Sequence, residues 1–168
     1  ARSLDPARER LARILGVRDP RAAPPEMRPD ATASRGSLVE NREGYRIHAV
    51  RWPAFGDVEG EGLLLEPFEP VACVVAIPDA DVTPEALCGL APGVDPDSRF
   101  PRKLAERRCR VIVPALIDRG VTHRNLSNRE FLYRSAFELG RHIIGYEVQK
   151  VLAAVDWLVE DRKAAPLP

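Results

Sequence analysis

Features that mark specialised protein classes are scarce in this sequence of 168 residues. Basic and acidic residues both number 25, so the net charge is zero and shows no nucleic-acid footprint. No apolar run comes near the ~20 residues that a membrane-spanning helix needs. The composition therefore predicts neither a nucleic-acid nor a membrane partner. A hydrophobic content of 45% is typical of a globular domain.

Cysteine is rare, with only Cys73, Cys88 and Cys109 in the chain. An odd count does not supply a disulfide framework, and the spacings match no zinc pattern. Cys73 and Cys109 lie in or at the start of apolar runs, where cysteine behaves as a small hydrophobic residue. We therefore expect structural thiols, no metal and no cofactor. The cysteines do not indicate a cellular compartment.

Catalytic motifs are also missing. The sequence has no G-x-S-x-G, no P-loop, no G-x-G-x-x-G and no H-E-x-x-H. The histidines, His48, His123 and His142, have no serine, cysteine or acidic partner at a recognisable spacing. We therefore predict that this chain contains no catalytic residue.

Residues 1–36 are expected to form a helix and a proline-rich linker. Asp5-Pro6 is typical of an N-cap followed by the first helical position, and Gly16 is a typical end. The apolar stripe between them is Leu11, Ile14 and Leu15. Because four prolines follow within residues 18–36, we expect a packed-on arm before a domain over residues 37–168.

The next segments predict an α/β fold. Residues 45–52 and 58–65 alternate in polarity and favour an antiparallel hairpin. Residues 71–77 and 109–117 are continuous apolar runs, as in parallel strands buried on both faces. Two helices are expected between those runs, one opened by Thr83-Pro84 and one near 96–108 with Phe100 and Leu104 inward. Together they make a right-handed βαβ unit.

A long helix is expected over residues 128–161, opened by the capping box Ser127-x-x-Glu130. Its apolar stripe at helical spacing favours core packing. The stripe consists of Phe137, Gly140, Ile144, Val148, Val151, Val155 and Leu158. Gly140 and Gly145 inside this helix indicate a kink or a close helix-to-sheet approach.

This order resembles the N-terminal half of an α/β-hydrolase of the dienelactone-hydrolase and acetyl-xylan-esterase-like kind. The resemblance rests on the hairpin G-Y-R-I-H-A-V-R-W…G-E-G-L-L-L-E-P, the two apolar strands and the helix segment A-A-V-D-W-L, over about residues 44–161. It implies a partial α/β-hydrolase fold that lacks the C-terminal half of the sheet. It also implies a serine-type esterase acting on a small-molecule ester, whose nucleophile, acid and histidine would lie beyond residue 168. The missing half of the domain would be a partner, and the chain alone would be inactive.

Two loops are the candidate site, because ligands of open α/β sheets bind beyond the carboxyl ends of the strands. The oxyanion-hole or pocket candidates are Asp79, Ala80, Asp81, Asp118 and Arg119. The family usually has His-Gly-x-Gly after its third strand, where this chain has Pro-Asp-Ala-Asp. A backbone N–H of Ala80 or Asp81 could still serve, since the donor is main-chain. The alternative is that Asp79 and Asp81 cap the following turn.

Two other functions stay open at this point. One is a non-catalytic relative kept as a binding or docking module, which the unusual oxyanion loop favours. The other is an unrelated doubly wound domain that binds a nucleotide or small ligand. The lack of a glycine-rich first turn argues against the second.

Overall fold

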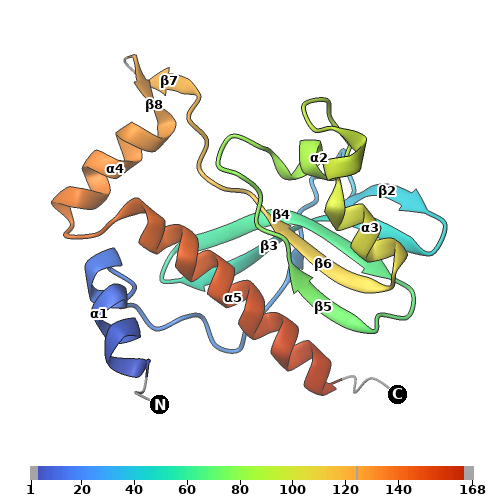
Figure 1. Ribbon diagram of the computed structural model, residues 1–168, viewed down its shortest axis with the longest axis horizontal. Helices are drawn as coiled ribbons and strands as arrows, with labels where there is room; N and C mark the ends of the chain where they lie inside the picture. Colours follow the sequence, from blue (N-terminus) through green and yellow to red (C-terminus); the bar gives the residue numbers. More distant parts are fainter. Residues whose placement is uncertain (1–3, 124, 165–168) are drawn as a thin grey trace.

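A six-stranded mixed sheet lies between helices in the computed structural model, which describes residues 4–123 and 125–164 (Figure 1). Its strands are β1 (Arg28–Pro29), β2 (Leu38–Arg42), β3 (Tyr45–Phe55), β4 (Val58–Pro67), β5 (Ala72–Val75) and β6 (Cys109–Pro114). A separate small hairpin is formed by β7 (Val121–His123) and β8 (Leu126–Ser127). The helices are α1 (Asp5–Leu15), α2 (Pro84–Leu87), the 3-10 turn η1 (Pro96–Ser98), α3 (Phe100–Glu106), α4 (Asn128–Glu138) and α5 (Ile143–Ala164).

The predicted hairpin is confirmed and is longer than expected. β3 and β4 pair antiparallel from Tyr45 opposite Pro67 to Phe55 opposite Val58. Gly56 turns the chain with a φ of 48°, a conformation that glycine adopts without steric cost. Gly62 on β4 lies against the β6 backbone, where a Cβ would overlap the carbonyl of Val113. The glycine that weakens β4 as a strand thus permits close contact with its neighbour.

The expected parallel pair is confirmed, with shorter strands. β5 and β6 pair in parallel, and the sheet order is β1-β3-β4-β6-β5, with β2 also on β3. The strand in the run at 71–77 is limited to Ala72–Val75. These residues are all half-buried rather than buried on both faces, because β5 pairs with β6 and with no other strand in the described part of the chain. The run at 109–117 ends as a strand at Pro114.

Two hydrophobic clusters cover the two faces of the sheet. Alternating residues of β3, β4 and β6 form one cluster with α2 and α3, including Ile47, Leu65 and Val111. The opposite residues form the second cluster with α5, including Trp52, Leu64 and Ile112. The indole N–H of Trp52 donates to the carbonyl of Lys150 at 2.9 Å and so ties the sheet to α5.

Two of the predicted helices need correction. The helix near 96–108 is η1 followed by α3, and Phe100 is exposed, whereas Leu104 packs on the core. The helix at 128–161 is two helices, because Gly140 has a φ of 68°, which ends α4. Part of the stripe predicted as core is consequently exposed to solvent. The exposed members are Phe137, Ile144 and Val155. The Ser127 cap is confirmed, since its hydroxyl accepts the Glu130 N–H at 3.1 Å.

The N-terminal arm rests on the start of α5. Gly16 ends α1 as predicted, with a φ of 77°, but the N-cap is Leu4 and not Asp5. The His142 N–H donates to the Leu15 carbonyl at 3.2 Å. A Cβ on Gly145 would overlap that same carbonyl, so Gly145 serves a close approach to α1 and not to the sheet.

Residues after α1 continue along the domain. The guanidinium of Arg141 grips the carboxylate of Asp19 with both Nη atoms. Further on, the Ala22 N–H donates to the Ala54 carbonyl, and β1 pairs with β3. The domain boundary at residue 36 stays a prediction. None of the helices over 4–123 and 125–164 is long and apolar enough to cross a membrane.

Candidate functional site

A hollow of about 640 Å³ opens at the carboxyl ends of β5 and β6. The loops after both strands border it, together with the facing parts of β2, β3 and β4. Of the five predicted site residues, Ala80, Asp81 and Asp118 line this hollow. Asp79 and Arg119 do not line it, although each contacts a residue that does.

The loop after β5 folds on its own carboxylate. The Asp79 Oδ1 accepts the N–H of Ala80 at 2.6 Å, and the Asp79 carbonyl accepts the Val82 N–H at 3.0 Å. Thr83 then caps α2 by accepting the Ala86 N–H at 3.1 Å. Asp79 therefore organises a local turn, as the alternative for Asp79 and Asp81 expected of it. The Asp81 carboxylate contacts Arg119 instead, and α2 takes its cap from Thr83. The Ala80 N–H, one of the two candidate oxyanion donors, already has a carboxylate partner.

The loop after β6 is organised around Asp118. Its Oδ1 accepts the Gly120 N–H at 2.6 Å and the side-chain amide of Asn128 at 3.1 Å. The next residue, Arg119, reaches across to the loop after β5 and contacts the Asp81 carboxylate at 3.0 Å. This ion pair joins the two candidate loops. Both partners are more than half exposed, so its contribution to stability is small.

A buried ion pair that the sequence analysis missed holds the loop after β6. Glu147 on α5 is 8% exposed and takes both Nη atoms of Arg129, at 2.9 and 3.0 Å. The same carboxylate accepts the Ile117 N–H at 3.2 Å, and Arg129 donates to the Ile117 carbonyl at 3.0 Å. The hydrogen bonds to Glu147 raise the pKa of Arg129, although partial burial of the guanidinium acts in the opposite direction. We call Glu147, Arg129 and Ile117 the clamp. Only the break between α4 and α5, marked by Gly140, could have suggested that these helices face each other.

The remaining titratable candidates stay away from the hollow. His48 lies on β3 and pairs with Leu64 of β4, and His142 precedes α5. His123 lies in β7, and its side chain is outside the described part of the structure. Cys88 is fully buried, and this burial raises the pKa of its thiol to about 12. Within 4–123 and 125–164, no three His, Cys, Asp or Glu side chains gather where they could hold a metal ion.

Comparison with known proteins supports the fold. No family model and no curated protein matches the sequence. A solved structure that does match is that of a candidate acetyl xylan esterase from Bacteroides fragilis NCTC 9343, with a TM-score of 0.61 and 19% identity. This chain has an esterase-like α/β fold. The match covers 91% of this chain and 41% of the other, so this chain spans less than half of that protein.

Proposed function

We propose that this chain forms the N-terminal part of a serine-type carboxylic-ester hydrolase domain and is inactive by itself. The observation that carries the proposal is the sheet order β4-β6-β5. It agrees with the order implied by the resemblance, in which the third strand lies between the fourth and the fifth. In this proposal β5 is the third strand, and a fifth strand would pair with its other edge, where no described strand pairs.

The exposed side of α5 supports a continuation of the sheet beside β5. Val148 and Val151 are half-buried and Val155 is exposed, although all three belong to one apolar stripe. Helix α5 also contacts β5. A further strand beside β5 would lie under this side of α5 and would bury apolar surface that now faces water.

In the intact domain, a serine would attack the acyl carbon of the ester, and a histidine would accept its proton. Both would come from outside this chain. This chain would contribute the floor of the pocket and one main-chain donor, the N–H of Asp81. No partner of that N–H is found among the described residues, whereas Ala80 donates to the Asp79 carboxylate.

The first experiment measures hydrolysis of p-nitrophenyl acetate by the 168-residue chain beside a buffer blank. We expect no turnover above the blank, because no serine, cysteine or histidine is among the described residues that line the hollow. Turnover that survives purification and is abolished by a single substitution in this chain, such as Asp81→Asn or His142→Gln, would show that the chain is itself an enzyme.

The acidic loop favours a second function, a non-catalytic docking module of the same fold. A developing oxyanion at the Ala80 N–H would meet the Asp79 carboxylate in its place, and like charges repel. An assay of ester hydrolysis by a longer protein that contains this chain distinguishes the two functions. Ester hydrolysis by that protein supports the hydrolase. Its absence, even when Asp79→Gly frees the Ala80 N–H, supports the docking module.

A further inference from the structure

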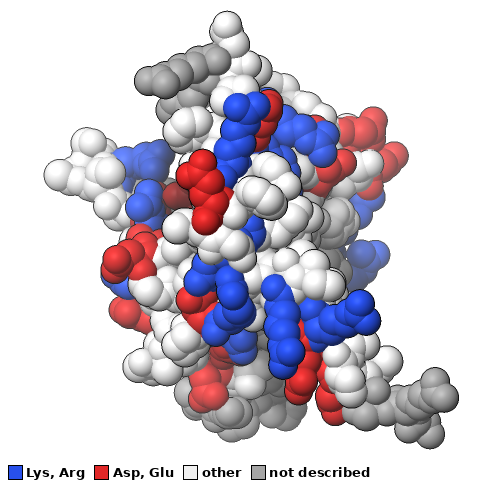
Figure 2. Space-filling view, turned by 90° about the vertical axis from the view of Figure 1, so that its left-hand side faces the viewer, with Lys and Arg blue, Asp and Glu red and all other residues white. Residues whose placement is uncertain are grey.

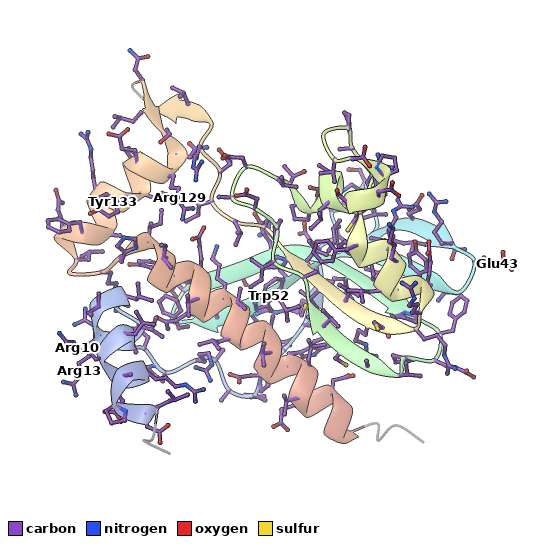
Figure 3. All side chains as sticks on the ribbon, in the orientation of Figure 1. Arg10, Arg13, Glu43, Trp52, Arg129 and Tyr133 are labelled. Carbon is purple, nitrogen blue, oxygen red and sulfur yellow. The ribbon has the colours of Figure 1, made fainter. Side chains whose placement is uncertain are left out.

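A second recess, which we call the notch, lies between α4 and the start of α5. Its volume is about 340 Å³, at the small end of the ~300–1,000 Å³ that is usual for ligand pockets. The residues that matter are Arg119, Arg129, Tyr133, His142, Ile143 and Ile144. Arg129 and Tyr133 extend from α4 on its side toward α5 (Figure 3). The notch shares none of its lining residues with the hollow.

Arg129 borders the notch and has a pair of donors that no described residue engages. A guanidinium has five N–H groups. Three of those of Arg129 are engaged, two on Glu147 and one on the Ile117 carbonyl. The Nε–H and one Nη2–H are left without a partner among the described residues, and they form one edge of the planar group. Such an edge matches a carboxylate through two parallel hydrogen bonds.

Arg119 supplies a second cation that can leave its present partner. It contacts Asp81 through Nη1 alone, in a pair where both side chains are more than half exposed. Exposed pairs of this kind are weak, so an anion in the notch can compete for Arg119. Glu130 also borders the notch, but its carboxylate is engaged by Arg134 at 2.8 Å.

The rest of the notch suits an apolar body and one polar contact. Ile143 and Ile144 provide aliphatic wall, and the Tyr133 ring stands edge-on to His142 with centroids 5.5 Å apart. His142 Nδ1 accepts the Ile144 N–H at 3.1 Å, so the neutral ring carries its proton on Nε2 as a donor. Cations beside an aromatic and aliphatic wall favour a small carboxylate with an apolar body.

The wider surface does not select an anion in the same way. Acidic and basic side chains are interspersed on the face that carries α1 and α4, and basic ones gather in its lower part, over α1 (Figure 2). Helix α1 contributes Arg8, Arg10 and Arg13 there, away from the notch. Selectivity for a carboxylate would therefore come from Arg119 and Arg129 locally.

We propose that the notch is a binding site for a small carboxylate with an apolar or aromatic body, separate from the hollow. Arg129 holds the carboxylate with its free edge, and Arg119 turns from Asp81 to close over it. Tyr133 and the two isoleucines cover the body of the ligand. Occupation of the notch would thereby break the link between the two loops that border the hollow.

The test is an NMR titration of the ¹⁵N-labelled full chain with benzoate as the probe. Benzamide, which has the same shape without the charge, is the ligand control. We expect saturable shifts at residues of the notch with benzoate and at least about tenfold weaker binding of benzamide, as for loss of a charged hydrogen bond. Arg119→Ala should weaken benzoate binding about tenfold. Arg10→Ala, on α1 and outside the notch, should change it less than about twofold.

Other results would overturn the proposal. Equal binding of benzamide would remove the role of charge, and shifts confined to the hollow would place the ligand elsewhere. Unchanged affinity for benzoate in Arg119→Ala would show that Arg119 does not close over the carboxylate. Ile144→Asp, at an exposed position, is a second variant that should abolish binding by placing a carboxylate at the notch. None of these outcomes depends on ester hydrolysis, so the proposal can fail or succeed independently of the hydrolase function.

Discussion

Breaking the clamp should cost this protein more stability than any exposed ion pair. In Arg129→Met, the Glu147 carboxylate would keep only the Ile117 N–H in a site where its side chain is 10% exposed. Leaving one charge of a buried pair without its partner costs about 3–5 kcal/mol. Since Arg129 is itself 22% exposed and water can enter from that side, we expect the lower end, about 3 kcal/mol. For a chain of this size that corresponds to a fall in Tm of about 6–12 °C.

The double variant Arg129→Met/Glu147→Leu distinguishes an unpaired charge from a loss of packing. With both charges gone, apolar side chains fill a similar volume, so the double variant should be more stable than Arg129→Met alone. The matched control is Arg134→Met, which removes an exposed pair with Glu130 on the same helix and should cost about 0.5 kcal/mol or less.

Urea unfolding followed by circular dichroism measures these free energies, at one protein concentration because self-association would shift the midpoint. A loss below about 1 kcal/mol in Arg129→Met would refute the reasoning, since it lies outside the range for a broken buried pair. The reasoning would also be refuted if the double variant lost as much stability as Arg129→Met and Glu147→Leu lose separately when added together, because the charges would then not interact.

Three further predictions concern the edge strand, the arm and the buried thiol. The chain alone should dimerise or aggregate through β5, because β5 is an apolar edge strand without lysine. In size-exclusion chromatography with light scattering, Val74→Lys should shift the chain toward monomer, and a stable unmutated monomer with a sharp thermal transition would contradict the prediction. Gly145→Ala should loosen the contact between α1 and α5, because the added Cβ would overlap the Leu15 carbonyl, even though alanine usually stabilises a helix by about 1 kcal/mol. We expect faster proteolysis near α1, and an unchanged rate would mean that the contact is not made. Burial raises the pKa of the Cys88 thiol from 9.0 to about 12, so the thiol loses its proton at lower pH in the unfolded chain, and the free energy of unfolding should fall as the pH rises between these two values. Cys88→Ala should lessen this fall, and an identical pH profile of stability in the variant would show that Cys88 does not cause it.

Local sequence patterns were sufficient for most elements near the sheet. Alternation over residues 45–52 and 58–65 predicted β3 and β4, because the side-chain period of a strand is visible in the sequence. The parallel pair followed from the two continuous apolar runs at 71–77 and 109–117. The cap at Ser127 and the end at Gly16 were also recognisable, since capping depends on residues a few positions apart.

Tertiary structure decided what depends on contacts between distant residues. Gly140 and Gly145 both looked like interruptions of one helix, but one ends α4 and the other admits α1. A glycine that adopts a positive φ and a glycine that makes room for a backbone are identical in sequence.

One part of the candidate site was predictable from the sequence, and another part was not. Placement after β5 and β6 was sufficient to bring Ala80, Asp81 and Asp118 to one hollow, because parallel neighbours end at the same edge of the sheet. The pairing of Glu147 with Arg129 was not predictable, because it depends on how α4 folds back over α5. Sequence alone thus determined which loops meet, through the direction and order of the strands. Only the packing of α4 on α5 decided which charges hold those loops, because an ion pair between separate elements has no local pattern.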